Sequence, residues 1–368
     1  MRERSRWQWR LGEPGDPNRL LTDFLAEHGL PVTDLAAPSV PAPAGAAVGA
    51  AVFVSAAAST AAIGGAAGQP TPAPAVPDVV AVVYERGETP TPPIRDQAPL
   101  RLGDWIDSWS PAEHAAAVQS VRAAIARGDV YQANVVGHAR AAYQGDPLPA
   151  LSRLATLPGA RYGGLLTGDG WAIGCASPET LVEVRSGRAI TRPIKGTRPA
   201  TADGRAELLA SAKERAEHIM IVDLERNDLA HVARTGSVTV EELFAVRRWC
   251  DLWQAESQIT AALADGVDLA ALLAAVAPGG SVTGAPKLAA LSQIAALEPV
   301  GRGVSMGAFG WVGHDRIDLG LTIRTVAADH THLHVWAGGG ITWGSEPDAE
   351  VAEAAAKAGP IRALLRDG

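Results

Sequence analysis

Cysteine is nearly absent from this sequence, since a chain of 368 residues contains only Cys175 and Cys250. The two are not spaced like a metal-binding pair, and neither lies in a motif typical of a catalytic thiol. The sequence therefore predicts no disulfide framework and no zinc site. We expect both cysteines to be buried free thiols.

Positive charge is also in short supply. The 32 lysine and arginine residues are outnumbered by 40 aspartate and glutamate residues, which gives a net charge of -8. This overall field does not favour binding to nucleic acid or to an acidic membrane surface. A small anionic ligand would need a local basic pocket.

Long hydrophobic runs of the kind found in signal peptides and membrane spans are missing. Residues 1–20 are charged, and the apolar run 46–68 is rich in alanine and glycine rather than leucine and isoleucine. We therefore expect no contact with a membrane and a cytoplasmic location.

Apolar residues make up 47% of the chain, which is enough to form a sizeable core. Residues 110–130 carry the signals of a helix: an N-cap serine, a proline in the first turn, apolar residues at helical spacing and a glycine at the end. Further helices are expected at 205–233, 268–276, 286–296 and 349–365.

Strand-like runs occupy much of the rest of the chain. They are expected at 51–55, 76–87, 131–143, 171–184, 187–194, 305–313, 317–329 and 332–344. Strands and helices are grouped rather than strictly alternating, so the pattern favours an α+β fold over a doubly wound sheet. Prolines within 88–99 predict a linker, and no internal repeat is evident.

Two helical segments each carry a pair of carboxylates three residues apart. Glu214 and Glu217 form the first pair, and Glu350 and Glu353 form the second, with Lys357 one turn further on. Two acidic pairs on separate helices suit a hard cation such as Mg²⁺. The alternative is that both are solvated helix faces with ordinary i,i+4 ion pairs.

Two glycine-rich segments and one arginine could hold an anion. The segment AGGGITWGS, 337–345, ends a predicted strand, and its amides could cradle a carboxylate or phosphate unless it is a simple bulge. The segment GGSVTGAPKLAAL, 279–291, could present amides at the positive end of a helix, but it lacks the order of a nucleotide P-loop. Arg324 falls in a predicted apolar strand, where an arginine usually has an anionic partner.

Lys195 lies in TRPIKGTRPA, residues 191–200, between proline-braced backbone and a glycine. From this local context alone, an exposed turn residue is favoured over a catalytic one.

The order of these motifs is more specific than any single one. Together they resemble the chorismate-utilising family, which includes the large subunits of anthranilate synthase and aminodeoxychorismate synthase and also the isochorismate and salicylate synthases. The motifs that carry the resemblance are SPE (177–179), RPIKGTRP (192–199), AEHIMIVDLERNDLA (216–230), GGSVTGAPK (279–287), LEPVGRG (297–303), IRT (323–325) and GGGIT with E..E...K (338–357).

The resemblance covers roughly residues 110–365 and implies an α+β fold like that of anthranilate synthase component I. In that fold, two large antiparallel β-sheets form a sandwich flanked by helices. Residues 110–368 would be the chorismate-binding catalytic region. Residues 1–109 would be a shortened N-terminal part of the sandwich with loops rich in alanine, glycine and proline, and the two parts would form one compact unit.

The resemblance also implies roles for individual residues. Mg²⁺ would be held by Glu217 and Glu353, with Glu214 and Glu350 as water-mediated or outer partners, and would bind the ring carboxylate of chorismate. Glu179 would be the general acid that protonates the leaving 4-hydroxyl, for which burial should raise its pKa.

Other residues are expected to contact the substrate because of their places in or beside the motifs. They are Gln132, Thr197, Gln254, Thr283, Arg324, Gly338, Gly339, Gly340 and Lys357. Arg324 and the amides of the three glycines would hold the carboxylate of the pyruvyl arm.

Two positions distinguish members of this family. Gln132 stands where isochorismate and salicylate synthases carry a lysine base, so ammonia rather than water is the expected nucleophile. Lys195 lies in PIKGT, as in aminodeoxychorismate synthases, whereas anthranilate synthases typically have PIAGT. In the former, this lysine is proposed to attack C2 before ammonia adds at C4. Its pKa should therefore be lowered by burial or by a nearby charge, for which Arg192 and Arg198 are candidates.

The expected reaction is magnesium-dependent amination of chorismate at C4 to 4-amino-4-deoxychorismate, for p-aminobenzoate and folate synthesis. The chain has no glutaminase signature, so ammonia would come from a separate glutamine amidotransferase subunit. Gln254 replaces a histidine near the leaving hydroxyl, Glu256 adds a carboxylate, and Ser305 replaces an aromatic residue of the pyruvyl pocket. An anthranilate synthase large subunit and a catalytically weakened binding subunit are the alternatives.

Overall fold

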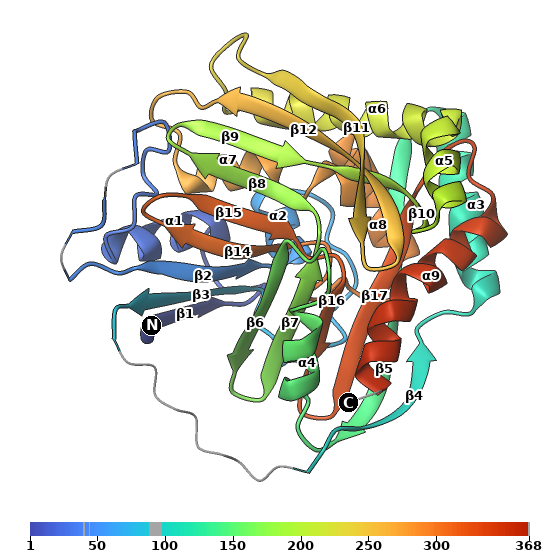
Figure 1. The fold of residues 1–368 in the computed structure, drawn as a ribbon, viewed down its shortest axis with the longest axis horizontal. Helices are drawn as coiled ribbons and strands as arrows, with labels where there is room; N and C mark the ends of the chain where they lie inside the picture. The colour runs from blue at the N-terminus through green and yellow to red at the C-terminus, as the bar shows by residue number, and fades with distance from the viewer. Residues whose placement is uncertain (40, 44, 88–97, 367–368) are drawn as a thin grey trace.

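The computed structural model describes residues 1–39, 41–43, 45–87 and 98–366, whose strands form two antiparallel sheets (Figure 1). The larger sheet has ten strands, in the order β1 (Arg2–Trp9), β3 (Val79–Glu85), β2 (Gly49–Val54), β14 (Ala308–Gly313), β15 (Ile317–Leu321), β8 (Thr180–Arg185), β9 (Arg188–Arg192), β12 (Leu252–Ala262) and β10 (Ile194–Pro199), with β11 (Thr239–Trp249) paired to β12. The smaller has seven, in the order β13 (Gly284–Ala285), β5 (Gln132–Gln144), β17 (His332–Ile341), β16 (Thr325–Ala328), β7 (Trp171–Ser177) and β6 (Tyr162–Gly168), with β4 (Arg101–Asp107) paired to β5. The expected α+β sandwich is confirmed.

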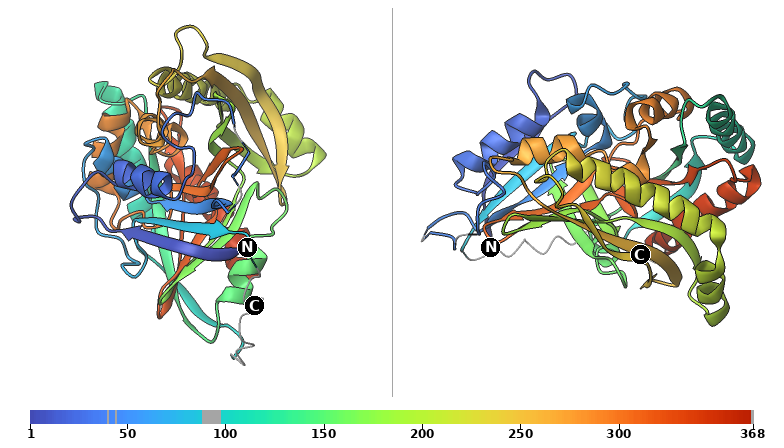
Figure 2. Two further views of the ribbon diagram at one scale, coloured as in Figure 1. Left: turned by 90° about the vertical axis from the view of Figure 1, so that its left-hand side faces the viewer. Right: turned by 90° about the horizontal axis from the view of Figure 1, so that it is seen from above.

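Nine α-helices lie within the described part of the chain. They are α1 (Pro17–Glu27), α2 (Ala56–Ala62), α3 (Pro111–Arg127), α4 (Leu148–Leu154), α5 (Ala202–Ala210), α6 (Ala212–Ala230), α7 (Leu269–Val276), α8 (Lys287–Leu297) and α9 (Pro347–Arg366). Seen from above in Figure 2, α6 lies across the larger sheet, and α3 packs beside α9 at the other end of the molecule. None of the described helices is long and apolar enough to cross a lipid bilayer.

The largest buried apolar cluster joins both sheets to the helices behind them. It includes Leu25 of α1, Phe53 of β2, Ile173 of β7, Leu273 of α7 and Leu319 of β15. Because strands from both ends of the chain contribute to this cluster, β1, β2 and β3 pack as part of the same sandwich as the later strands.

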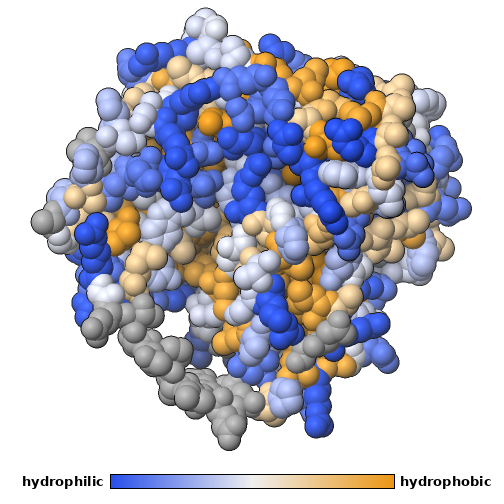
Figure 3. Space-filling view, in the orientation of Figure 1, coloured by the Kyte–Doolittle hydropathy of each residue, from blue (hydrophilic) through white to orange (hydrophobic). Residues whose placement is uncertain are grey.

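The edge strand β11 is polar on its outer side. Hydrophilic residues predominate over the β11–β12 hairpin at the top of the face in Figure 3, where Glu241, Glu242 and Arg248 are exposed. Charged side chains along an exposed edge oppose pairing with another chain.

Two of the predicted strands are each divided between the two sheets. The run 171–184 leaves the smaller sheet after Ser177 and enters the larger one at Thr180. The run 317–329 makes the opposite crossing between Leu321 and Thr325. The prediction of single strands was wrong because apolar residues continue through both crossings, and the change of partner strand has no local signature in sequence.

The helix prediction for 205–233 was correct in type but missed a break. The segment forms α5 and α6, separated at Ser211, whose backbone is extended and whose hydroxyl accepts a hydrogen bond from Glu214 N at 3.2 Å. The helix expected at 110–130 is α3, where Ser110 and Glu113 form a capping box and Gly128 ends the helix with a φ of 82°.

Several elements were not predicted from the sequence. These are β1, β4, β6, β10, β11, β12, β13, α1, α2 and α4. The linker expected at 88–99 lies mainly outside the described residues. Cys175 is a buried free thiol as expected, whereas Cys250 is only partly buried.

A buried ion pair fixes the loop between α7 and α8. Glu298, at the end of α8, pairs with Arg302 at 2.7 Å, and both side chains are buried. Arg302 also donates to the carbonyl oxygens of Val282 at 2.6 Å and Asn134 at 3.2 Å. Glu298 accepts a hydrogen bond from Val136 N at 3.0 Å. The pair therefore ties this loop to β5. The loop and β5 each contribute residues to the cavity described below.

The substitution Arg302→Met should lower the free energy of unfolding by about 3–5 kcal/mol, because it leaves the Glu298 carboxylate buried without a cationic partner. Urea denaturation followed by tryptophan fluorescence measures this loss. The matched control is Arg234→Met, which removes the exposed ion pair with Asp265 and should cost less than about 1 kcal/mol. Equal losses in the two variants would contradict the structural role of the buried pair.

Candidate active site

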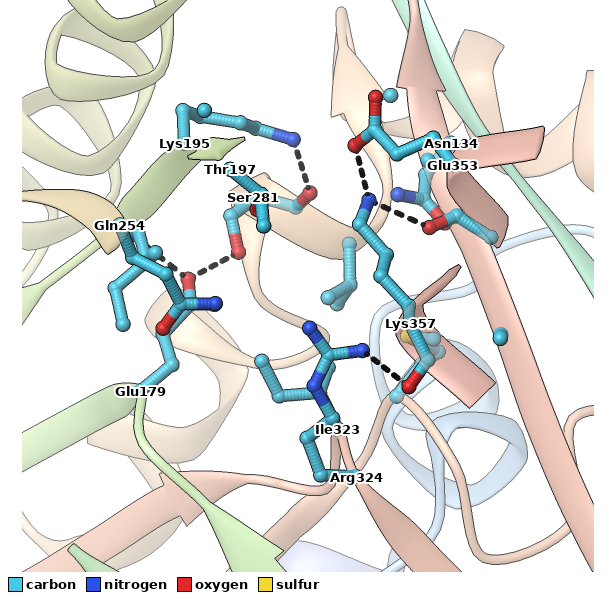
Figure 4. A pocket seen from close by; sticks show the side chains of 18 of the residues that line it. Asn134, Glu179, Lys195, Thr197, Gln254, Ser281, Ile323, Arg324, Glu353 and Lys357 are labelled. Atoms are coloured by element: carbon cyan, nitrogen blue, oxygen red, sulfur yellow. Dashed lines mark hydrogen bonds and ion pairs between the residues drawn. The ribbon is translucent and has the colours of Figure 1, made fainter. Parts of the chain in front are cut away.

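A cavity opens between the two sheets and the helices α6 and α9. Its lining includes most of the residues predicted from sequence: Glu179, Lys195, Thr197, Glu214, Glu217, Gln254, Arg324, Gly338, Gly339, Gly340, Glu350, Glu353 and Lys357. Figure 4 shows side chains from both sheets and from α9 projecting into the same space. Residues as far apart in the sequence as Asn134 and Lys357 thus meet in one site.

Lys195 lies on β10 next to a β-bulge at Gly196, which has a φ of 79°. Bulges of this kind redirect a neighbouring side chain, and here the Lys195 amine reaches the cavity and donates to the carbonyl oxygen of Ser281 at 3.0 Å (Figure 4). The local expectation of an exposed turn residue was therefore wrong.

The pKa of the Lys195 amine is lowered, as expected, chiefly by burial and next by the positive charge of Lys357. The positive charge beside Lys195 was expected to come from Arg192 or Arg198. Arg192 pairs with Glu183 at 2.9 Å and Arg198 pairs with Glu214 at 3.0 Å, so the charges of both arginines are engaged by carboxylates. The neighbouring cation that acts on Lys195 comes instead from α9, which sequence proximity could not reveal.

Glu179 lies at the crossing from β7 to β8 and is buried. Its Oε1 accepts hydrogen bonds from Ser281 Oγ at 2.5 Å and from Ile194 N at 3.3 Å. Burial raises the pKa of this carboxyl to about 7, although the hydrogen bond from Ser281 and the charge of Lys195 act in the opposite direction. The expected rise in the pKa of Glu179 is confirmed, and its carboxyl can hold a proton near neutral pH.

Arg324 lies at the other crossing, between β15 and β16. The prediction that it lies on a strand was therefore wrong. Its backbone has a φ of 54°, which is unusual for a residue with a side chain. The guanidinium lies over the ring of Trp249 at 4.7 Å and donates to the carbonyl oxygen of Lys357 at 3.1 Å. Burial lowers its pKa to about 10. No carboxylate among the described residues forms an ion pair with it, so this buried cation fits an anionic group of a ligand.

The four glutamates of the two acidic pairs all line the cavity. Glu214 pairs with Arg198, Glu217 accepts from Thr342 Oγ1 at 2.8 Å, and Glu353 pairs with Lys357 at 2.6 Å. The contacts of Glu214 and Glu217 reach other elements, so the first pair is not simply a solvated helix face, whereas Glu353 and Lys357 form the i,i+4 ion pair that the alternative expected.

The fit of these carboxylates to a metal ion is partial. Among the described residues, no three histidine, cysteine, aspartate or glutamate side chains lie close enough together to hold an ion by themselves. Mg²⁺ in such sites usually takes one or two protein carboxylates and completes its shell with water and an anionic substrate. Glu217 of α6 and Glu353 of α9, which line the same cavity, suit that kind of donor set.

The glycine run lies within β17, which is paired with β5 throughout this stretch. The carbonyl oxygen of Gly338 accepts from Lys357 Nζ at 2.9 Å, so this peptide faces the cavity. In an antiparallel pair, the N–H and C=O groups of successive residues point alternately toward and away from the partner strand. The backbone groups of Gly340 therefore face the cavity like those of Gly338, and the amide of Gly339 faces β5. Only two of the three expected amides therefore face the site.

Two predicted residues do not line the cavity. Thr283 is buried with its hydroxyl donating to the carbonyl oxygen of Gly279 at 2.8 Å, and it faces a different cavity. Gln132 is buried outside the lining, with its Oε1 3.5 Å from where a Cβ on Gly340 would lie. The start of α8 also contributes nothing to the lining, so the amides expected there are not part of the site.

Sequence reasoning missed Ser281 and Asn134. Ser281 bonds both Lys195 and Glu179, and it stands in the segment GGSVTGAPK, where the glycines and Thr283 were given weight instead. Asn134 stands two residues after Gln132, which is the spacing of neighbours on one face of a strand.

The positions that depart from the family pattern are distributed around this site. Gln254 lines the cavity. Glu256, two residues along β12, is buried and pairs with Arg161 at 3.1 Å. Ser305 is buried, and its hydroxyl donates to the carbonyl oxygen of Thr322 at 3.3 Å.

Comparison with known proteins agrees with this arrangement. A family model described as chorismate binding enzyme matches residues 67–363. Aminodeoxychorismate synthase component 1 of Salmonella typhimurium is 39% identical over 265 residues, which cover 70% of this chain and 58% of that protein. Anthranilate synthase component 1 of Streptomyces coelicolor is 38% identical over 269 residues, covering 71% of this chain and 52% of that protein. The chain thus spans little more than half the length of these relatives.

The solved structure of anthranilate synthase component I from Streptococcus pneumoniae superposes with a TM-score of 0.80 at 25% identity, covering 98% of this chain and 90% of that one. The two kinds of synthase are matched at nearly equal identity, so similarity alone does not separate their products. The family match spans every segment that lines the cavity, and the chain belongs to the chorismate binding enzyme family.

Proposed function

We propose that this protein aminates chorismate at C4 with ammonia and Mg²⁺ to give 4-amino-4-deoxychorismate. The observation that carries the proposal is the buried amine of Lys195, which lies in the cavity and shares Ser281 as a hydrogen-bonding partner with Glu179. A nucleophile and an acid held by one residue suit a reaction in which one bond to the ring forms as another breaks.

Binding of chorismate would use the two ends of the cavity. Arg324 is a buried cation without a carboxylate partner among the described residues, and it would pair with the carboxylate of the pyruvyl arm. The cavity-facing amides of Gly338 and Gly340 lie on the same strand edge and would assist. The ring carboxylate would face Glu217 and Glu353, and Mg²⁺ bound there would neutralise the repulsion between these like charges.

The chemistry would proceed in two displacements. The Lys195 amine adds to C2 with its lone pair, both ring double bonds shift by one position toward C4, and the C4 hydroxyl leaves as water with the proton of Glu179. Ammonia then adds at C4, both double bonds shift back, and Lys195 leaves C2 as the free amine. Chorismate and ammonia are thus converted to 4-amino-4-deoxychorismate and water, with Lys195 and Glu179 restored after proton exchange.

Ammonia would be supplied by a separate glutamine amidotransferase subunit. The printed names of the relatives, component 1, support a multi-subunit enzyme. A cytoplasmic location and a role in p-aminobenzoate and folate synthesis follow from the same proposal.

The product decides the proposal. Chorismate incubated with this protein, Mg²⁺ and ammonium should give a compound with the mass of 4-amino-4-deoxychorismate, resolved by chromatography with mass spectrometry. Conversion of that compound to p-aminobenzoate by an added lyase would identify it. Anthranilate with release of pyruvate would assign C2 amination instead, which the similarity to the Streptomyces coelicolor protein favours to nearly the same degree.

The substitution Lys195→Ala should reduce the rate of C4 amination by at least about 100-fold, because it removes the nucleophile. Initial rates of product formation measure this change, with thermal unfolding as a check on the fold. Near-normal turnover would exclude the covalent role of Lys195.

A second pair of variants tests the position of the amine. Gly340→Ala places a methyl group 2.8 Å from Lys195 Nζ and, like Lys195→Ala, should slow amination. Gly359→Ala is the matched control, because nothing lies within 4 Å of its added methyl group, and it should leave the rate unchanged.

The rate should fall on the alkaline side with an apparent pKa near 7. Glu179, with its pKa raised to about 7, holds the required proton below that pH and loses it above, so the rate drops about tenfold per pH unit. Ser281→Ala removes a hydrogen bond that favours the ionised carboxylate, which should raise the pKa and move the fall to higher pH. Profiles of kcat/KM against pH measure the shift, and an unmoved alkaline limb would remove Glu179 from the role of acid.

A further inference from the structure

The β11–β12 hairpin brings an aromatic side chain to the crossing that carries Arg324. Trp249 and Leu252 form the last pair of this hairpin, and the two-residue turn between them begins at Cys250, whose φ is 47°. Cys250 N donates to the carbonyl oxygen of Pro158 at 3.0 Å, which fixes the turn. The hairpin thereby places a buried tryptophan against a residue of the cavity, although Trp249 does not line the cavity itself.

One residue of β7 holds both the tryptophan and the arginine. Trp249 Nε1 donates to the carbonyl oxygen of Ala176 at 3.2 Å, and Ala176 N donates to the carbonyl oxygen of Arg324 at 3.1 Å. The Arg324 guanidinium lies 4.7 Å from the centroid of the Trp249 ring. This distance is within the range of about 6 Å over which a cation is attracted to the face of a ring, and the attraction is stronger where water is excluded.

The ring supplies part of the stabilisation that a carboxylate would otherwise give to Arg324. The guanidinium is buried, and among the described residues only its Nη1 forms a hydrogen bond, to the carbonyl oxygen of Lys357. Burying a cation without a counter-ion costs free energy. The negative face of an aromatic ring offsets part of this cost without neutralising the charge. The cation therefore remains available to an anionic ligand.

The acids of the cavity are the competing partners for this cation. Burial has the largest influence on the pKa of Arg324 and lowers it, whereas the charges of Glu353 and Glu179 act to raise it. In the structure these carboxylates have other partners, because Glu353 pairs with Lys357 and Glu179 bonds Ser281. A guanidinium that left the ring would be drawn toward one of these carboxylates, and a ligand would then have to break that contact before binding.

We propose that Trp249 is a positioning residue that keeps the Arg324 guanidinium free and directed into the cavity for the carboxylate of the pyruvyl arm, an inference that rests on the substrate binding proposed above. Figure 4 shows the guanidinium projecting toward the middle of the cavity. Because Trp249 acts through Arg324 and not on the reacting atoms, its loss should weaken binding of chorismate and leave kcat nearly unchanged.

Two substitutions grade the contribution of the ring. Trp249→Met removes the ring and should raise the KM for chorismate about tenfold, whereas Trp249→Phe keeps a ring face and should raise it about two- to threefold. In both variants kcat should change less than about twofold. Steady-state kinetics with chorismate, Mg²⁺ and ammonium chloride give the two constants. Calorimetric titration with chorismate and Mg²⁺, without ammonium, should give a Kd that rises by the same factors.

A change of the arginine separates positioning from a general effect on the fold. In an Arg324→Lys background no guanidinium lies over the ring, so adding Trp249→Phe should leave the Kd for chorismate unchanged. The matched control is Trp253→Phe in the same hairpin. Trp253 Nε1 also donates to a carbonyl oxygen, that of Thr201 at 2.8 Å, but no cation of the described residues lies over its ring. This control should keep the parent Kd and kcat.

An unchanged Kd in Trp249→Phe would overturn the role of Trp249, whether or not Trp249→Met folds. A loss of kcat at constant Kd would overturn it as well, and so would a further rise of the Kd on adding Trp249→Phe to Arg324→Lys. Binding is measured without turnover, so a parent chain that binds chorismate but forms a C2-aminated product would contradict the proposed function alone. A parent chain that binds no chorismate would overturn both.

Discussion

Two hydrogen bonds between the sheet crossings hold the site together. Leu321 N donates to the carbonyl oxygen of Glu179 at 3.0 Å, and Ala176 N donates to that of Arg324 at 3.1 Å. At these points the chain must leave one sheet and enter the other, so side chains there cannot alternate between the two faces of a single sheet. They project into the space between the sheets instead. The same backbone constraint therefore places the Glu179 carboxyl and the Arg324 guanidinium. The left-handed backbone conformation of Arg324 costs conformational energy, which is part of the cost of this placement.

Burial sets the protonation states in this space, and it acts in opposite directions on acids and bases. The pKa of Glu179 rises and that of Lys195 falls, so both groups shift toward their neutral forms. Ser281 reaches both, through its hydroxyl on one side and its carbonyl oxygen on the other. The loop that carries Ser281 is in turn fixed by the buried pair of Arg302 and Glu298. A chain with a net charge of -8 thereby keeps, in one cavity, a carboxyl whose pKa is raised to about 7 and an amine whose pKa is lowered.

Elements with local signals could be predicted from sequence, and those defined by distant partners could not. Helix α3 has its cap, its first-turn proline and its terminal glycine within the segment itself, and it forms as expected. The crossings after Ser177 and Leu321 depend on which strand pairs with which, so two continuous strands were expected in their place. Lys195 shows the same limit, because the bulge at Gly196 and the charge of Lys357 are tertiary features. Motif order identified most of the cavity residues, but Ser281 was hidden among glycines that were given more weight.

The residue that β5 contributes to the cavity lining, Asn134, carries no charge. The cations and carboxylates of the cavity come from α6, α9, β10 and the two crossings, and they suit an anionic ring with a leaving hydroxyl. The face of β5 offers only amides, Gln132 and Asn134, opposite a strand whose residue 340 lacks a side chain. A basic group nevertheless lies in this corner, because a Cβ on Gly340 would lie 2.8 Å from Lys195 Nζ. Burial lowers the pKa of that amine, so proton transfer here would depend on Lys195 and not on the amides of β5. The charged groups of the other walls would then serve to bind an anionic ligand.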